Sequence, residues 1–341
     1  MLPNVSRTPE KAGQTGEDIV ILSRLTAAAI VALWLAGAAQ AQVLTIVTTQ
    51  AGSFTNSLGS AVAKVIVEKT GMKATVSAQQ SHGHEAVQDG AAQLSVVTIS
   101  DLQQFVTGTI DWAGKGEKKN IRLIGAMIPI MTTAYVKTDS PIKSIKDLKG
   151  KRVPWGFPVQ KSVQRVVQAQ LLGAGLTEKD IQPVPARNIV QSADDFAAGK
   201  TDAFWFALGS GKVKQVDAKV GGLRALPIDT GAKALEALEA FVPGSYVIKL
   251  KPSKALEQIK SEIPVQAYDV VFFTSNKVSD DVIYKITKAV HENKKDMAAV
   301  FPAMNRFNPD TMAKKYKVLQ YHPGAIKYFT EKGMWPPKAG S

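Results

Sequence analysis

The chain has 341 residues, of which 45% are hydrophobic, and a formal net charge of +13. This length favours two domains, and the absence of cysteine excludes disulfides, thiolate metal sites and cysteine nucleophiles. The basic residues are scattered and do not alternate with aromatic side chains, so we expect no nucleic-acid partner. A basic chain instead favours anionic solutes, acidic partners or a membrane surface.

The first 41 residues have the features of an export signal. Residues 25–37 form a short apolar run after Arg24, and Ala39 and Ala41 are the small residues that a signal peptidase reads. The run is too short for a comfortable membrane span, and no cysteine follows it for lipid attachment. We expect a signal peptide with an extended N-terminal tail, cleavage after Ala41 and a periplasmic mature protein. An uncleaved anchor is the alternative.

The first element of the mature chain predicts a strand, a polar loop and a helix. Residues 43–49 are β-branched and mostly apolar, as a buried strand should be. After the loop at 50–57, apolar residues recur from Leu58 to Ile66 at helical spacing. A helix that begins at a loop presents unpaired N–H groups and the positive end of its dipole, which suits a carboxylate or phosphate. An ordinary turn that binds nothing fits these residues about equally well.

Strands and helices then alternate, which predicts an α/β fold with mixed, mostly parallel sheets flanked by helices. A charged, proline-containing segment at 138–152 separates two such series. The first series has strands at 73–79, 93–98, 121–127 and 132–137 and helices at 86–91 and 102–106. The second has strands at 152–155, 181–184, 201–206 and 223–226 and helices at 161–172, 189–198, 213–220 and 232–240.

The C-terminal part predicts a strand at 267–274 and helices at 280–293, 309–316 and 323–332. We expect the chain to cross to a second lobe near Lys137–Ser140 and to return through residues 246–267. The first lobe would then hold residues 42–137 and 268–341, and the second lobe residues 138–267. Two crossings of this kind leave a cleft between the lobes, at the carboxyl ends of the strands.

Four stretches resemble the TAXI family of solute-binding proteins, which serve tripartite ATP-independent periplasmic (TRAP) transporters. They are SPIKSIKDLKGKRV at 140–153, AGKTDAF at 198–204, VIYKITKAV at 282–290 and LQYHPGAIKYFTEKG at 319–333. The last stretch discriminates best, because ABC-type binding proteins share the first two. The resemblance implies a two-lobed periplasmic-binding-protein fold of type II. It also implies a monomeric receptor that closes on a small solute and docks on TRAP membrane subunits.

Two loops depart from the family pattern. The loop at 52–57 lacks the tyrosine pair of the family, and the loop at 156–160 lacks its Gly-Ser-Gly-Thr-like segment. In the second loop Pro158 also removes a backbone donor. The glutamate-like ligands of the family are therefore in doubt, whereas the helix starts and the basic charge still predict a small, carboxylate-type anion.

The candidate ligand-binding residues lie in loops at strand ends or on strands that enter the cleft. Some have a structural alternative: Thr98 and Ser100 as helix caps, Trp205 as core, and Tyr246 as a hinge-packing aromatic. The full set is Gly52, Ser53, Phe54, Thr55, Asn56, Gln80, Ser81, His82, Thr98, Ser100, Gly156, Phe157, Gln160, Asp202, Trp205 and Tyr246.

Metal and enzyme chemistry are poorly supported. His82 and His84 stand next to Glu85, but no third ligand group accompanies them, so we expect a polar turn and no metal or cofactor. The chain has no nucleophile elbow, phosphate-loop motif or dinucleotide fingerprint, and no paired carboxylates, so we expect no enzyme. Two alternatives to a TRAP receptor stay open. They are a receptor for an ABC importer of the sulfonate or pyrimidine-precursor type, and a sensor that presents ligand to a membrane signalling protein.

Overall fold

The computed structural model describes residues 43–79 and 83–337, which belong to one compact unit. The predicted signal peptide and the candidates Gln80, Ser81 and His82 lie outside the described residues. None of the helices in the described ranges has the length and apolar character that a membrane crossing needs.

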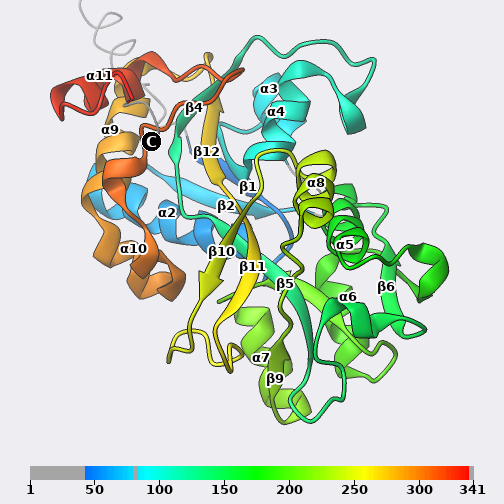
Figure 1. Cartoon of the computed structure of the whole chain (residues 1–341). Helices are drawn as coiled ribbons and strands as arrows, with labels where there is room; N and C mark the ends of the chain where they lie inside the picture. The colour runs from blue at the N-terminus through cyan, green and yellow to red at the C-terminus, as the bar shows by residue number, and fades with distance from the viewer. Residues whose placement is uncertain (1–42, 80–82, 338–341) are drawn as a thin grey trace, which may run out of the picture. The chain divides into compact units, whose positions relative to one another are not determined.

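The first sheet has the strand order β2-β1-β3-β12-β4. Strands β2, β1 and β3 are parallel, and β12 runs antiparallel to both β3 and β4. Helices α2, α9, α10 and α11 gather on one side of this sheet and α3 and α4 on the other (Figure 1). The strands are β1 (Leu44–Thr48), β2 (Ala74–Ala78), β3 (Leu94–Thr98), β4 (Ile121–Ala126) and β12 (Val270–Ser275). The helices are α2 (Phe54–Thr70), α3 (His84–Asp89), α4 (Ile99–Thr107), α9 (Asp280–Glu292), α10 (Lys294–Val300) and α11 (Pro323–Glu331).

The second sheet has the order β10-β11-β5-β8, with β9 also paired to β5, and a separate parallel pair joins β6 and β7. Helices α5 and α8 pack against each other, as do α6 and α7 (Figure 1). The strands are β5 (Ile130–Lys137), β6 (Arg152–Gly156), β7 (Gln182–Ala186), β8 (Phe204–Ala207), β9 (Leu223–Ala225), β10 (Tyr246–Leu250) and β11 (Ile263–Tyr268). The helices are α5 (Lys161–Gly173), α6 (Ile189–Ala197), α7 (Gly211–Val220) and α8 (Ala232–Phe241).

The two sheets define two lobes that are joined at two adjacent crossings. Strand β4 leads into β5 through residues 127–129, and β11 leads into β12 through Asp269. The backbone N–H of Met127 donates to the carbonyl of Val270 at 2.8 Å, so the two crossings are bonded to each other. We call the elements around the first sheet the first lobe, and those around the second sheet and the β6–β7 pair the second lobe.

The observed strands differ from the sequence-based expectation in two respects. Strand β5 precedes the crossing expected near Lys137–Ser140, yet it pairs with β8, β9 and β11 of the second sheet. Residues 246–267, expected to be a connection, contain the antiparallel hairpin β10–β11. All pairings of the larger second sheet are antiparallel rather than mostly parallel. The reason is that β5 carries the chain into this lobe and its neighbour β11 carries it out.

The helical segments differ at a few ends. Helix α2 begins at Phe54 rather than Leu58, because the Ser53 hydroxyl accepts a hydrogen bond from the Asn56 N–H at 3.2 Å and caps the helix there. Residues 309–316, expected to be helical, form only a short 3₁₀ turn, and α10 was not expected. The 3₁₀ turns are η1 (Ile110–Trp112), η2 (Ile145–Leu148), η3 (Glu178–Asp180), η4 (Pro302–Arg306) and η5 (Pro309–Thr311).

Candidate functional site

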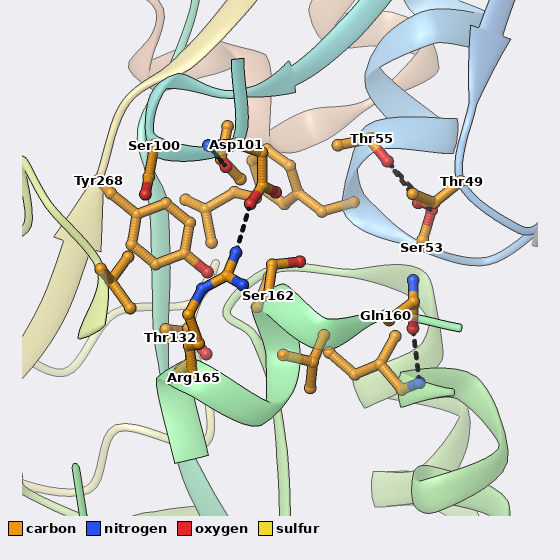
Figure 2. A pocket seen from close by; sticks show the side chains of 18 of the residues that line it. Thr49, Ser53, Thr55, Ser100, Asp101, Thr132, Gln160, Ser162, Arg165 and Tyr268 are labelled. Carbon is orange, nitrogen blue, oxygen red and sulfur yellow. Dashed lines mark hydrogen bonds and ion pairs between the residues drawn. The ribbon is translucent and has the colours of Figure 1, made fainter. Parts of the chain in front are cut away.

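A cavity of about 80 Å³ lies between the two lobes, and the first turns of α2, α4, α5 and α6 all reach it. The first lobe contributes hydroxyl groups and one carboxylate, while the second lobe contributes most of the apolar surface and one arginine (Figure 2). The lining residues are Thr49, Ser53, Phe54, Thr55, Thr98, Ser100, Asp101, Ile130, Thr132, Gln160, Ser162, Val163, Arg165, Val166, Ile189, Phe206, Ala207, Val242 and Tyr268.

The wall from the first lobe is a cluster of hydroxyls at the start of α2. The Thr49 hydroxyl lies 2.7 Å from that of Ser53 and 2.5 Å from that of Thr55 (Figure 2). All three side chains are buried, so their positions are fixed by one another and by the cap of the helix. Hydroxyl groups held in this way can donate to an oxyanion without further ordering of the protein.

The beginning of α4 extends this wall. The Thr98 hydroxyl accepts a hydrogen bond from the Asp101 N–H at 3.3 Å and so caps the helix, while the Ser100 hydroxyl accepts one from Gln104 at 3.0 Å. Both predicted residues line the cavity, and Thr98 also has the capping role that the sequence left open, whereas Ser100 lies within the first turn of the helix and does not cap it.

The wall from the second lobe begins at Gln160, the residue before α5. Its Oε1 accepts a hydrogen bond from the Ile189 N–H at 2.8 Å, which joins the starts of α5 and α6 (Figure 2). The amide group also exchanges two hydrogen bonds with Gln50 of the first lobe. Gln160 thus contacts both lobes at the rim of the cavity.

The guanidinium of Arg165 is the cation of the described cavity lining, and it is already paired. Its Nη2 lies 3.0 Å from Oδ1 of Asp101, and its Nη1 forms a second, very close ion pair with Asp111 in η1. The exposed fractions of the three side chains are 11%, 7% and 26%. The sequence-based interpretation did not include Arg165 or either carboxylate.

The helix starts contribute positive partial charge to the cavity in addition to the charge of Arg165. Each helix carries the equivalent of about half a positive charge at its N-terminus, and such charge is strongest within the first turn. At α5 no side chain caps the helix, and the Val163 N–H already donates to the Gln160 carbonyl at 2.9 Å, so the N–H groups of the two preceding residues are those that a bound group could use. Burial and the nearby Asp101 charge raise the pKa of Tyr268, so its phenol stays neutral and can donate a hydrogen bond.

Five of the described candidates lie elsewhere or point away. The Asn56 amide donates to the Thr48 hydroxyl at 3.0 Å, while Gly52 occupies a turn with a φ of +83°. Gly156 is the last residue of β6, and Phe157 begins the turn before α5 with its ring fully buried in the core. Asp202 pairs with Arg152 at 2.6 Å in a different, surface depression.

The two remaining candidates, Trp205 and Tyr246, make contacts outside the cavity lining. Trp205 is 1% exposed, and its indole N–H donates to Oε1 of Gln170 at 2.8 Å, so it belongs to the core of the second lobe. The Tyr246 hydroxyl donates to Asp269 at 3.1 Å, at the crossing between β11 and β12. Burial and the Asp269 charge raise the pKa of Tyr246. Neither ring lines the cavity, in agreement with the core and hinge alternatives.

Of the two histidines considered as metal ligands, the structure describes His84, whereas His82 lies outside the described residues. The ring of His84 is buried and packs against Phe105, Trp112 and Phe273, with centroid distances of 5.0, 5.6 and 5.9 Å. His84 therefore belongs to an aromatic cluster of the first lobe.

Some of the cavity residues that the sequence analysis missed could have been found from the sequence, and others could not. Ser162 and Arg165 follow the predicted start of α5 by helical spacing, and Asp101 is adjacent to the predicted Ser100. Thr132 and Tyr268 belong to the strands next to the crossings, so their role depended on the correct assignment of β5 and β11.

Comparison with known proteins adds a family match. The model of the NMT1-like family matches residues 46–333. A TctC solute binding protein from Polaromonas shares 14% identity over 79% of this chain and 91% of that chain, with a TM-score of 0.48. The alkanesulfonate-binding protein SsuA from Xanthomonas axonopodis pv. citri, bound to MOPS, shares 16% identity over 79% of this chain and 81% of that chain, with a TM-score of 0.45. The periplasmic aliphatic sulphonate binding protein SsuA from Escherichia coli shares 15% identity over 87% of this chain and 95% of that chain, with a TM-score of 0.43.

Proposed function

We propose, from the premise that the chain belongs to the NMT1-like family, that it is a periplasmic solute receptor for a small organic anion. The observation that carries the proposal is the cavity between the lobes at which four helices begin. The helix starts and the hydroxyl cluster suit an acid group, because both offer donors to an oxyanion.

The rest of the cavity suits a carbon skeleton. Phe54, Val163, Val166 and Phe206 line it together with other apolar side chains. Ligand pockets commonly combine an apolar wall with a few fixed polar groups that orient the ligand. An organic acid with an apolar body fits this combination better than a sugar, which would need polar partners on every side.

Binding would act through closure of the lobes. A solute that touches α2 and α4 of the first lobe and α5 of the second makes its full set of contacts only when the lobes are together. Such a ligand shifts the population toward the closed form by its differential affinity for the two forms. The closed form would then present a joint surface of both lobes to a membrane importer.

The sequence resemblance pointed to TRAP membrane subunits as the partner, through the TAXI family. The family whose model matches the chain is the NMT1-like family, and the TAXI assignment is not confirmed. We therefore put the permease of an ABC importer first, which was the alternative in the sequence analysis. Reconstitution with each class of membrane subunit would decide between them.

A ligand screen tests the binding proposal. The mature chain is melted with monocarboxylates, dicarboxylates, sulfonates, amino acids and neutral sugars, and affinities are then measured by calorimetry. A ligand at about 100 times its Kd should add roughly 2.7 kcal/mol to the free energy of unfolding. A response to neutral sugars or cationic amines alone would contradict the anion proposal.

A matched pair of serine variants localises the site. Ser162 lines the cavity, whereas the Ser60 hydroxyl donates to the Asn56 carbonyl in α2 at 2.9 Å, away from the lining. Ser162→Ala should weaken binding of the responding acid by about ten- to a hundredfold, since one hydrogen bond to a charged group contributes about 1.5–3 kcal/mol. Ser60→Ala should leave the affinity unchanged. Equal effects of both variants would argue against this cavity.

A further inference from the structure

The ion pairs of Arg165 join one lobe to the other. Arg165 belongs to α5 of the second lobe, whereas Asp101 belongs to α4 and Asp111 to η1 of the first lobe. Residues 101 and 111 are 64 and 54 positions from residue 165 in the sequence, so the ion pairs depend on how the two lobes come together. Figure 2 shows the guanidinium pointing across the cavity toward Asp101.

The group formed by Arg165, Asp101 and Asp111 has more negative than positive charge. One guanidinium meets two carboxylates, and the arginine and Asp101 side chains are only 11% and 7% exposed. A ligand acid that paired with Arg165 would have to displace a carboxylate that is already within hydrogen-bond distance. It would also bring a third negative charge to the same cation. The first turns of α2 and α5 carry no acidic residue and offer the acid group a place without this repulsion.

We propose that Arg165 is a positioning residue that clasps the two lobes through Asp101 and Asp111, and that the acid group of the ligand is held by the helix starts. The assignment of the ligand's acid group rests on the proposed function, whereas the clasp itself does not. When the lobes separate, all three ions regain water, so the clasp acts chiefly on the alignment and lifetime of the closed form.

The clasp has a counterpart at the opposite end of the cavity. Gln160, the residue before α5, and Gln50 of the first lobe exchange two amide hydrogen bonds there, at 3.2 and 3.0 Å. The first part of α5 is therefore held to the first lobe twice, just before its first residue and again at Arg165. Two contacts restrict the orientation of the helix more than a single contact would.

The test uses the ligand-free protein. Because the chain has no cysteine, labels can be placed only where cysteines are introduced. Val67 in α2 and Leu235 in α8 are 44% and 48% exposed and lie in different lobes. Distances between spin labels at V67C and L235C report the closed and open populations. In this background Arg165→Met should lower the closed population, because the closed form would keep the Asp101 carboxylate buried after losing the guanidinium that pairs with it there.

The expected size is about a tenfold shift in the ratio of closed to open protein. The Kd of a ligand that needs the closed form should rise as the inverse of the closed fraction, and therefore by at most about tenfold. Asp111→Asn removes one carboxylate and should give a smaller shift in the same direction. In the Arg165→Met background, Asp111→Asn should change the closed population less than it does in the wild type. The reason is that the guanidinium with which Asp111 pairs is already absent. If the Arg165→Met variant does not fold, the spin-label distances of Asp111→Asn alone test the proposal.

The opposite role gives different results. If Arg165 instead holds the ligand, Arg165→Met leaves the ligand-free distances as in the wild type and abolishes binding. That outcome, or unchanged distances in Asp111→Asn and Arg165→Met alike, would overturn the clasp. A failure of the proposed function would appear as the absence of any responding acid in the ligand screen, which leaves the ligand-free distances unaffected.

Discussion

The side-chain amides of Gln50 and Gln160 face each other across the two lobes, and each donates to the other, at 3.2 and 3.0 Å. Gln50 precedes α2, and Gln160 precedes α5. Because Gln160 also accepts the N–H of Ile189, one amide pair connects the starts of three helices at the rim of the cavity.

The two glutamines should differ in their effect on stability. Gln50→Ala removes a contact between lobes and should cost about 0.5–1.5 kcal/mol. Gln160→Ala removes the same contact and also leaves the Ile189 N–H without its acceptor, so its cost should be about 1–3 kcal/mol. Urea unfolding of both variants measures the difference. A larger loss for Gln50→Ala than for Gln160→Ala would contradict this account.

The glycine of the C-terminal His-Pro-Gly-Ala stretch allows two helices to approach. A Cβ atom at Gly324 would overlap the Asp280 carbonyl and lie 2.9 Å from the Tyr284 nitrogen, both backbone atoms of α9. Gly324→Ala should therefore separate α11 from α9 and lower the free energy of unfolding by about 1–3 kcal/mol.

Gly211 at the beginning of α7 is a matched control for this substitution. A Cβ atom there would meet nothing within 4 Å. Gly211→Ala should be neutral or raise the free energy of unfolding by about 0.4–1 kcal/mol, because it restricts the unfolded chain. Thermal melts of both variants are sufficient, and an equal loss of stability in the two would show that the close approach to α9 is not the cause.

Trp205 should contribute to stability and not to ligand affinity. Trp205→Phe removes the donor to Gln170, whose amide also donates to Gln266 at 2.8 Å. The buried Oε1 of Gln170 would lack its donor, at a cost of about 1–3 kcal/mol. Calorimetry with the acid found in the screen should give the wild-type Kd at a temperature where the variant is folded. A changed Kd would return Trp205 to the candidate ligand residues.

Acid should destabilise the fold in part through His322. The imidazole is buried; its Nε2 donates to the Val278 carbonyl, and its Nδ1 accepts the Gly324 N–H and caps α11. Burial is the main cause that lowers the pKa of His322 below its ordinary value near 6.5. Because the unfolded chain then binds the proton more readily, this contribution to stability is complete above about pH 6.5. It is lost as the pH falls from there toward the lower, folded-state pKa.

His322→Asn tests the pH dependence. Asparagine keeps an acceptor for the helix cap but does not titrate, so the variant should lose less stability than the wild type between pH 7 and pH 5. The slope should not vanish, because burial also lowers the pKa of His291. Unfolding free energies at several pH values provide the measurement. Parallel curves for the variant and the wild type would exclude His322 as a contributor.

Much of the fold could be predicted because each lobe alternates short β-branched strands with amphipathic helices. The first strand and α2, for example, follow from the runs at 43–49 and 58–66 almost without ambiguity. The antiparallel pairing of the second sheet could not be predicted, because strand direction depends on how the chain enters and leaves the lobe. Residues 246–250 and 263–268 also carry exposed and polar positions and a proline, which weakened the strand pattern.

The candidate site was predictable where it depends on helix starts and not where it depends on pairing in space. Ser53, Thr55, Ser100 and Gln160 were expected from the loops before helices, and all four line the cavity. Arg165 could not be recognised as a residue of the site, because it pairs with two carboxylates of the other lobe that are distant in the sequence.

The hydrogen bond from Met127 to Val270 has a consequence for how this protein moves. Two connections that are bonded to each other behave as one narrow strip, about which the halves can rotate, whereas sliding or shearing would rupture the strip. In a crystal structure of the unliganded protein, each lobe should therefore superpose separately on the lobe described here. The difference should be confined to a few backbone torsions on either side of residues 127–129 and 269.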